Sequence, residues 1–333
     1  MKRHITAMLV IAMLAGLSAV PLQAADTLVI APAPAPIFTP ARYDGTPAEM
    51  TAVVEIENGR YAIGLGDSNM AGYGLDAYSY AEDGVISALT DGSLGDAAFT
   101  GLLKSDQQAL DYSTSGSTSA DAAAALAGIS DEMLANTRYV VVNTSGNDIL
   151  HALRQLIPYL APAAMQAAGS VSSIEELIPM LAGAPINEML LPIVSGLAGE
   201  IAAANAANLN ALIDDLQARA PGAVAVFTTI PNPIPAELAA LAGEGSAIAL
   251  LTGLLDTMNA NLAEIVAAQN LEGKTAKYAV VDVNALENAP AFQADGIHFD
   301  AATHEMVGAE IQDVLKDLYF NSVQKKMMML GIQ

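Results

Sequence analysis

The sequence contains no cysteine and no tryptophan, and each absence excludes a class of protein. Without cysteine the chain can have no disulfide framework, no thiolate metal site and no cysteine nucleophile. It also lacks the residue to which bacterial lipoproteins attach their lipid. Aromatic residues make up only 5% of the chain, and sugar-binding clefts usually present aromatic platforms, so a carbohydrate ligand is disfavoured.

Basic residues are also scarce, because 13 Lys and Arg stand against 36 Asp and Glu, for a formal net charge of -23. Such a surface repels phosphate backbones and anionic lipid headgroups. We therefore expect no nucleic acid as a partner. The simplest role of the charge is to keep the protein in solution.

The N-terminus has the pattern of a secretory signal peptide over residues 1–25. Two basic residues, Lys2 and Arg3, precede an apolar run over 5–20, and small residues at Ala24 and Ala25 provide a cleavage site. The alternative is a membrane anchor, but the run is shorter than the ~20 apolar residues that a spanning helix needs. We therefore expect a bacterial, Sec-exported protein, secreted or periplasmic, with no stable membrane span after cleavage and a net charge near -25, because Lys2 and Arg3 leave with no acid.

The rest of the chain alternates between strand-like and helix-like segments, after a leader rich in Pro and Ala at 26–48. Asn58-Gly59 predicts a hairpin whose second strand leads to Ser68. Later apolar runs lack polar alternation, as expected of parallel strands covered on both faces; they lie at 107–116, 138–148, 222–233 and 277–286, with helices expected at 121–134, 205–220 and 246–269. This pattern predicts an α/β protein of three layers, α/β/α, with about five mostly parallel strands in one domain over 49–320 and a C-terminal tail at 321–333.

One segment is too long for this pattern. About fifty residues, at about 150–205, are rich in Leu, Ala, Ile and Met, whereas connections in such folds are typically ~2–6 residues. We expect an insertion of short helices, because five prolines interrupt it: Pro158, Pro162, Pro179, Pro185 and Pro192. It is either an extra helical layer of the core or an apolar lid over a site.

Ligands of open parallel sheets bind at the carboxyl ends of the strands, and there the sequence places Ser68. A serine nucleophile needs a base. His298 lies in the loop after the last predicted strand, three residues after Asp295, where that carboxylate can orient the imidazole toward Ser68. Donors for a developing oxyanion are the amides of Ser68 and Gly116 and the side chain of Asn147.

Four short blocks carry these residues in a fixed order: "GDSN" at 66–69, "STSGSTS" around Gly116, "SGND" at 145–148 and "DGIH" at 295–298. In this order they resemble the four blocks of the SGNH, or GDSL-type, hydrolase superfamily. The sequence of these blocks is particularly similar to that of the bacterial lysophospholipase, arylesterase and thioesterase branch. The resemblance covers all five predicted strands but neither the leader nor the insertion.

The resemblance implies a flavodoxin-like SGNH fold and a serine esterase without cofactor or metal. Ser68 is then the nucleophile, His298 the general base and Asp295 its orienting acid. Ser68, Gly116 and Asn147 form the oxyanion hole. Two positions depart from the family pattern, since Asn69 occupies a place where leucine is frequent and Ser145 one where a glycine usually stands.

Other interpretations of the same residues are weaker. The Gly-x-Ser-x-Gly elbow of α/β-hydrolases is missing, because Met70 follows where glycine is required. A metal site at His298, Asp300, His304 and Glu305 is disfavoured, because histidines six apart fall on different sides of a helix. We expect His304 at the surface of the last helix and His151 at the start of a helix, with lining of the pocket as the alternative role of His151.

Two aspartates, Asp67 and Asp148, flank these blocks, and their expected role is to hold the loops by hydrogen bonds. The expected substrate is a small-molecule or lipid ester, with an acyl chain or a simple alcohol part. The alternatives are a carbohydrate O-acetyl esterase and a non-catalytic secreted binding protein on the same fold. The sequence leaves the oligomeric state open.

Overall fold

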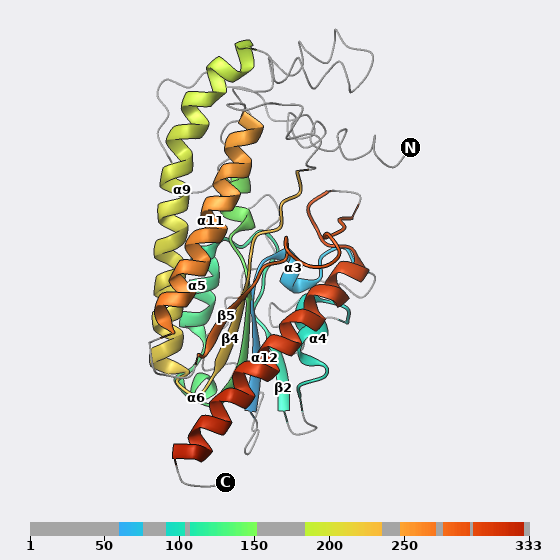
Figure 1. The fold of residues 1–333 in the computed structure, drawn as a ribbon, viewed down its shortest axis with the longest axis vertical. Coiled ribbons are helices and arrows are strands. Elements are labelled where there is room, and N and C mark those ends of the chain that lie inside the picture. Colours follow the sequence, from blue (N-terminus) through green and yellow to red (C-terminus); the bar gives the residue numbers. More distant parts are fainter. Residues whose placement is uncertain are drawn as a thin grey trace.

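The computed structural model describes seven segments of the chain: 60–75, 91–103, 107–151, 184–234, 247–270, 276–293 and 296–329. The expected signal peptide, the leader and most of the expected insertion lie outside these segments. Within them the chain forms one sheet with helices on both faces (Figure 1).

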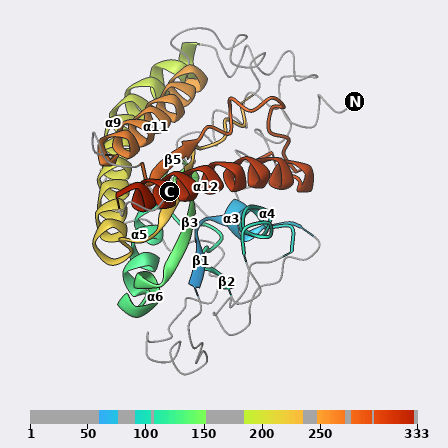
Figure 2. The same ribbon diagram turned by 60° about the horizontal axis from the view of Figure 1, so that its bottom comes forward.

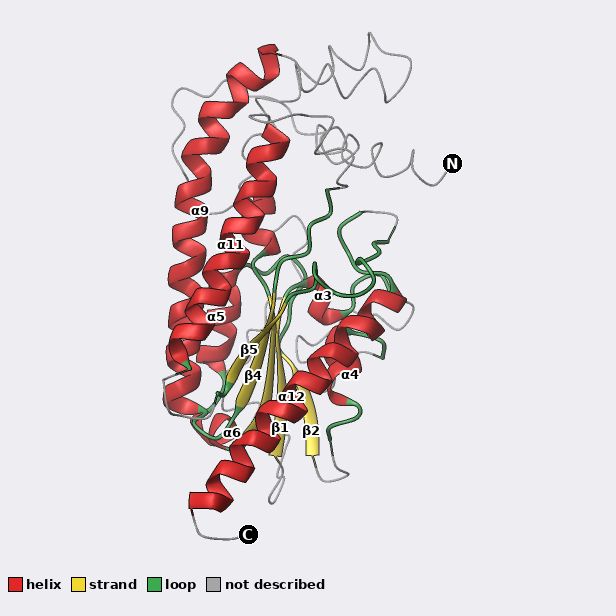
Figure 3. Ribbon diagram, viewed as in Figure 1, coloured by secondary structure: helices red, strands yellow, loops and turns green. Residues whose placement is uncertain are grey.

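The sheet has five strands, all parallel, in the order β2-β1-β3-β4-β5 (Figure 3). The strands are β1 (Arg60–Gly66), β2 (Gln107–Asp111), β3 (Thr137–Asn143), β4 (Val224–Thr228) and β5 (Tyr278–Val281). β1 is the strand predicted to lead to Ser68, and the other four coincide with the predicted apolar runs except that β3 begins one residue earlier, at Thr137. The α/β class and the parallel sheet are confirmed.

Successive side chains of each strand enter two different cores. In β3, Val140 and Val142 belong to one buried cluster, while Val141 belongs to the other. In β4, Phe227 and Val226 divide in the same way. Burial on both faces explains why these strands are apolar without alternation.

Helices α5 (Ser119–Gly128), α6 (Asp131–Ala135), α9 (Ala184–Arg219) and α11 (Ala247–Gln269) cover the first face. Helices α3 (Ser68–Ala71), α4 (Leu94–Phe99) and α12 (Ala301–Met329) cover the second. Figure 2 shows α12 lying across its face of the sheet, opposite α9 and α11.

Two helix predictions need correction. The segment 121–134 is not one helix, because Ile129 leaves the helical conformation at φ -77, ψ 140 and Ser130 then caps α6. The part of the expected insertion that the structure describes is not made of short helices either. Residues 184–205 are continuous with the next predicted helix in α9, which has Pro185 in its first turn, where proline is favoured, and passes through Pro192.

The predicted hairpin at Asn58-Gly59 lies outside the described residues, but its second strand is described. β1 is bonded to β2 along one edge and to β3 along the other, both in parallel. No edge of β1 is therefore left for an antiparallel partner, and the hairpin prediction is wrong for this strand. At the other terminus, residues 321–329 of the expected tail continue α12.

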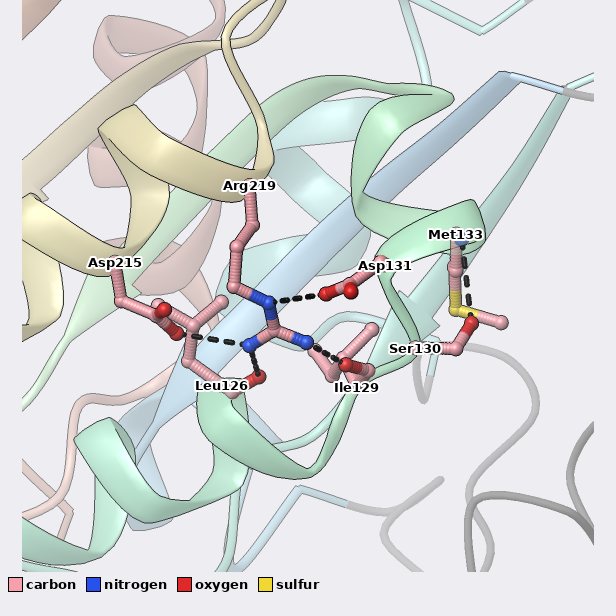
Figure 4. Close-up of polar contacts among 7 residues, drawn as sticks. All are labelled: Leu126, Ile129, Ser130, Asp131, Met133, Asp215 and Arg219. Atoms are coloured by element: carbon pink, nitrogen blue, oxygen red, sulfur yellow. Dashed lines mark hydrogen bonds and ion pairs between the residues drawn. The ribbon is translucent and has the colours of Figure 1, made fainter.

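The end of the sheet where the strands begin is held by Arg219, the last residue of α9 (Figure 4). Its guanidinium binds Asp131 at 2.6 Å and Asp215 at 2.9 Å. It also donates to the backbone carbonyls of Leu126 and Ile129, where α5 ends. One side chain therefore joins α9 to the α5–α6 turn.

Within the described segments, none of the helices has both the length and the apolar character needed to cross a bilayer.

Candidate active site

The strand order brings three of the four sequence blocks together at the carboxyl end of the sheet, where the strands end. β1 lies between β2 and β3, so the loops that carry Ser68, Gly116 and Asn147 leave neighbouring strands. Backbone bonds join these loops beyond the strands, from Thr114 N to Gly66 O at 3.0 Å and from Asp67 N to Asn143 O at 3.0 Å. The predicted convergence of these blocks is therefore what the fold produces.

Ser68 is the first residue of α3, directly after the turn that ends β1. Asp67 is the N-cap, and its Oδ1 accepts from the amide of Asn69 at 2.9 Å. Gly66 has φ 153, and a Cβ there would lie 1.9 Å from the carbonyl oxygen of Asn143. The block needs glycine because the turn passes too close to β3 for any side chain.

The hydroxyl of Ser68 meets the imidazole of His298, with Oγ and Nε2 2.8 Å apart. His298 comes from the loop after β5, which is separated from β1 by two strands, or about 14 Å at ~4.8 Å per strand. The long loop between β5 and α12 spans this distance. The ring of Tyr73 packs against the imidazole, with centroids 4.5 Å apart.

Two side chains hold the His298 loop against the Ser68 turn. The side chain of Gln293 donates from Nε2 to the backbone carbonyls of Tyr73 at 2.7 Å and Phe299 at 2.8 Å. The backbone N–H of Gln293 donates to the carbonyl of His298 at 2.8 Å. Asn69 accepts at Oδ1 from the amide of Phe299, at 2.9 Å. The His298 loop is therefore held by Gln293, which precedes His298 in the sequence, and by the bond from Phe299, which follows it.

The amide of Asn147 lies over the loop that carries Gly116. Its Nδ2 donates to the carbonyl of Ser117 at 3.0 Å, which uses one of its two N–H groups. Gly116 itself has φ 86, a left-handed conformation that glycine adopts without strain. Asn147 and Gly116 are thus brought together as the sequence predicted.

Ser145 opens the Asn147 block in an unusual conformation. Its φ is 87, the one positive value for a residue other than glycine in the described segments. This conformation explains why glycine is frequent at the position. The serine is held by a bond from Asn205 Nδ2 of α9 to its Oγ, at 2.8 Å.

Asp148 closes the same block and binds the start of α5. Its two carboxylate oxygens accept from the amide of Ser119 at 2.9 Å and from its hydroxyl at 2.7 Å. Asn208 of α9 donates to that hydroxyl at 2.9 Å. The loop-holding role predicted for Asp148 and for Asp67 is confirmed by these bonds.

Burial changes the acidity of the carboxyl groups at this edge. Burial raises the pKa of Asp67 to about 6, while the amide of Asn69 and the nearby His298 act against the rise. The pKa of Asp111, at the end of β2, is also raised to about 6 by burial, against hydrogen bonds from Ser113. Both carboxyl groups are therefore still mostly ionised at pH 7, and each takes up its proton as the pH falls through about 6.

His304 is not the surface residue that the sequence predicted, because it is fully buried. Its ring packs edge to face on Phe299, with centroids 5.6 Å apart. Burial, with a smaller contribution from His298, lowers its pKa to about 4. The described segments contain no group of three or more His, Asp or Glu side chains that could hold a metal ion.

Of the predicted residues, the structure thus brings together Ser68, His298, Gly116 and Asn147. Asp295 lies outside the described residues. His151 is helical and half-buried, the last residue described after the Asn147 block.

Four further polar residues shape the site and were not recognised as such from the sequence: Asn69, Gln293, Asn205 and Asn208. For the last two a signal existed. Asparagine is a poor helix former, and two of them three residues apart in an alanine-rich helix mark one face that binds something polar. Asn69 and Gln293 had no such pattern, because the backbone groups that they bind across the site, at Phe299 and Tyr73, are far away in the sequence.

The sequence of this chain matches the family model described as GDSL-like Lipase/Acylhydrolase over residues 63–311. The match spans about three quarters of the 333 residues and includes every block discussed above. No curated protein sequence matches the chain.

Among solved structures, the chain is similar to an extracellular lipase from Streptomyces rimosus, with 16% identity, a TM-score of 0.47, and 77% of this chain and 99% of that one covered. It is similar to phospholipase A1 from Streptomyces albidoflavus, with 18% identity, a TM-score of 0.44 and coverage of 77% and 98%. It is also similar to a family 3 carbohydrate esterase from Clostridium thermocellum, with 16% identity, a TM-score of 0.42, and 78% of this chain and 99% of that one covered.

Proposed function

Because the chain belongs to the GDSL-like lipase/acylhydrolase family and is a serine ester hydrolase, we propose that it cleaves carboxylic esters through an acyl-enzyme on Ser68. The observation that carries this proposal is the 2.8 Å contact between Ser68 Oγ and His298 Nε2. A serine hydroxyl becomes a nucleophile when a base at hydrogen-bonding distance takes its proton.

In the first half of the reaction, His298 Nε2 accepts the proton of Ser68 while Oγ attacks the ester carbonyl carbon. The carbonyl oxygen becomes an oxyanion, for which the donors are the amides of Ser68 and Gly116 and Nδ2 of Asn147. Preorganised donors of this kind stabilise the transition state because they need no reorientation during the reaction. The C–O bond then breaks, and the leaving alkoxide takes the proton from His298.

In the second half, His298 takes a proton from water, and the hydroxide attacks the acyl-serine. Collapse of this second tetrahedral intermediate returns the proton to Ser68 and releases the carboxylic acid. We assign to Asp295 the role of orienting the imidazole, on the basis of the DGIH block alone. No step requires a cofactor.

The composition favours an acyl-chain or simple ester over a sugar ester. The chain offers no tryptophan platform, and a buried apolar cluster adjoins the Asn147 block through Ile149. This cluster includes Ile230 after β4 and Met258 of α11. Apolar side chains beside an ester-cleaving site suit an acyl chain.

The proposal is tested with p-nitrophenyl butyrate on wild type and Ser68→Ala. We expect the variant to lose about 10⁴-fold or more in kcat, as serine hydrolases do when the nucleophile is removed. Equal rates for the two proteins would show that another group performs the chemistry.

The substrate class is tested separately by comparing p-nitrophenyl esters from acetate to palmitate with an O-acetylated oligosaccharide. We expect kcat/KM to be higher for an ester of intermediate chain length than for the acetylated sugar. A preference for the sugar would favour the carbohydrate esterase alternative instead.

We also propose that the protein is exported, because residues 1–25 have the pattern of a signal peptide. Expression of the full chain in a Gram-negative host, followed by fractionation and N-terminal sequencing, tests this. Cleavage after Ala24 or Ala25 with activity outside the cytoplasm is the expected result, and an uncleaved cytoplasmic protein would contradict it.

A further inference from the structure

We propose that Asn69 is a positioning residue that holds His298 on Ser68, a role that rests on the function proposed above. Asn69 directly follows Ser68, and its partner Phe299 directly follows His298. Two adjacent residues of one segment therefore bind two adjacent residues of another, through a 2.8 Å and a 2.9 Å contact.

The peptide group between His298 and Phe299 is the structural unit that Asn69 controls. Its carbonyl accepts from the amide of Gln293 at 2.8 Å, and its N–H donates to Asn69 Oδ1 at 2.9 Å. With both ends bonded, rotation of this peptide plane is restrained, and the His298 Cα, which lies in the plane, is restrained with it. The point from which the imidazole leaves the backbone is held in this way.

The Ser68 contact acts at the Nε2 tip of the imidazole, whereas the Asn69 contact acts on the backbone that carries the ring. Asn69 therefore restrains the loop at a point that the Ser68 contact does not reach. Asn69 and Phe299 are both buried, so water does not compete for the bond. Asn69 is itself placed by the α3 N-cap, because its amide donates to Asp67 Oδ1.

In this chain position 69 supplies an acceptor. Phe299 N–H is a backbone donor inside the protein, and an apolar residue at 69 would leave it without this partner. A loop released in this way keeps its sequence and its fold but places the base less accurately. Since displacement of a catalytic group by about 1 Å can cost 10²-fold in rate, the effect appears in kcat more than in KM.

The test uses two near-isosteric variants of the full-length protein with p-nitrophenyl acetate. Asn69→Leu removes the acceptor, and we expect kcat to fall about 10- to 100-fold with KM within about 2-fold. Asn69→Asp keeps an acceptor oxygen, and we expect it to retain most of kcat on the plateau of its pH profile. If Asn69→Leu does not fold, Asn69→Ala replaces it with the same expectation.

A matched control comes from Asn270, whose Oδ1 accepts from the amides of Lys277 and Tyr278 at 3.0 and 3.2 Å, where β5 begins. Asn270→Leu removes these two contacts and the bond from Asn270 Nδ2 to the carbonyl of Tyr278 at 2.7 Å, all at the opposite end of the sheet. We expect it to lower Tm as Asn69→Leu does, but to leave kcat within about 2-fold. Equal losses of kcat in the two variants would reduce the role of Asn69 to general stability.

The decisive measurement is a double-mutant cycle with His298→Ala. If Asn69 acts through His298, Asn69→Leu changes the residual kcat by less than about 2-fold in the His298→Ala background. The same loss in both backgrounds, or no loss in the wild-type background, overturns the proposal. Failure of the proposed function is distinguishable, because Ser68→Ala would then remain active.

Discussion

At the carboxyl end of the sheet, segments 230 residues apart are joined by two hydrogen bonds, Ser68 with His298 and Asn69 with Phe299, of which the second is buried. At the opposite end, Arg219 uses its charge to join α9 to the α5–α6 turn, with a partner in Asp131 that is 86% exposed. The first end depends on exact placement and the second on attraction between charges. We therefore expect changes at the first end to reduce catalysis and changes at the second to reduce stability.

The largest separation of these two effects is expected from Asn147. Asn147→Ala removes a proposed oxyanion donor, and loss of one such donor costs about 10²- to 10³-fold in kcat. Its bond to Ser117 contributes only about 1 kcal/mol to stability. Steady-state kinetics and thermal unfolding on the same samples check this. A loss of kcat below 10-fold would remove Asn147 from the oxyanion hole.

The reverse result is expected from Arg219→Met, which keeps the apolar stem and removes four polar contacts. Two backbone carbonyls at the end of α5 lose their donor, so we expect the free energy of unfolding to fall by about 2–3 kcal/mol with kcat unchanged. Urea denaturation measures the free energy of unfolding, and steady-state kinetics on the same samples measure kcat.

Lys316→Met is the matched control for Arg219→Met. Lys316 binds Asp313 on the exposed side of α12 at 3.0 Å, and exposed pairs contribute ~0–1 kcal/mol. A stability loss as large for this variant as for Arg219→Met would mean that loss of charge alone, not the Arg219 contacts, is responsible.

A smaller effect, confined to acid pH, is expected from His304, which is buried behind the site. Its pKa of about 4 in the folded protein is below 6.5, so the unfolded chain binds its proton first as the pH falls. The free energy of unfolding therefore decreases between pH 6.5 and 4. His304→Leu lacks this term, so its stability relative to wild type should rise by about 1–2 kcal/mol from pH 7.5 to pH 5.

Urea denaturation of both proteins at the two pH values measures this difference. Asp67 and Asp111, with folded pKa values of about 6, act in the opposite direction, since stability is lost as the pH rises from 3.8 through 6. Wild type and His304→Leu both retain these two aspartates, so their contributions to the pH dependence cancel when the two proteins are compared. A difference between wild type and variant that is constant with pH would contradict the buried, neutral state of His304.

The sequence was sufficient where the signal is local. Apolar runs without alternation, such as that of Val140 to Val142, predicted buried parallel strands because both faces of each strand are covered. Short polar blocks after three of the strands predicted where Ser68, Gly116 and Asn147 meet, since the ends of parallel strands share one edge. The sequence was insufficient where the partner is distant, as with the buried position of His304 and the length of α9.

The class of chemistry, that of a serine ester hydrolase, was therefore predicted from the sequence, from four short blocks in a fixed order that carry a serine, a histidine and the proposed oxyanion donors. The tertiary structure decided how accurately they are held. The two departures from the family pattern are explained only by their partners in the fold. Asn69 accepts a hydrogen bond from Phe299, and Ser145 accepts one from Asn205. The physical reason is that a hydrogen bond depends on the position of both of its atoms, and the sequence around one of them says nothing about where the other lies.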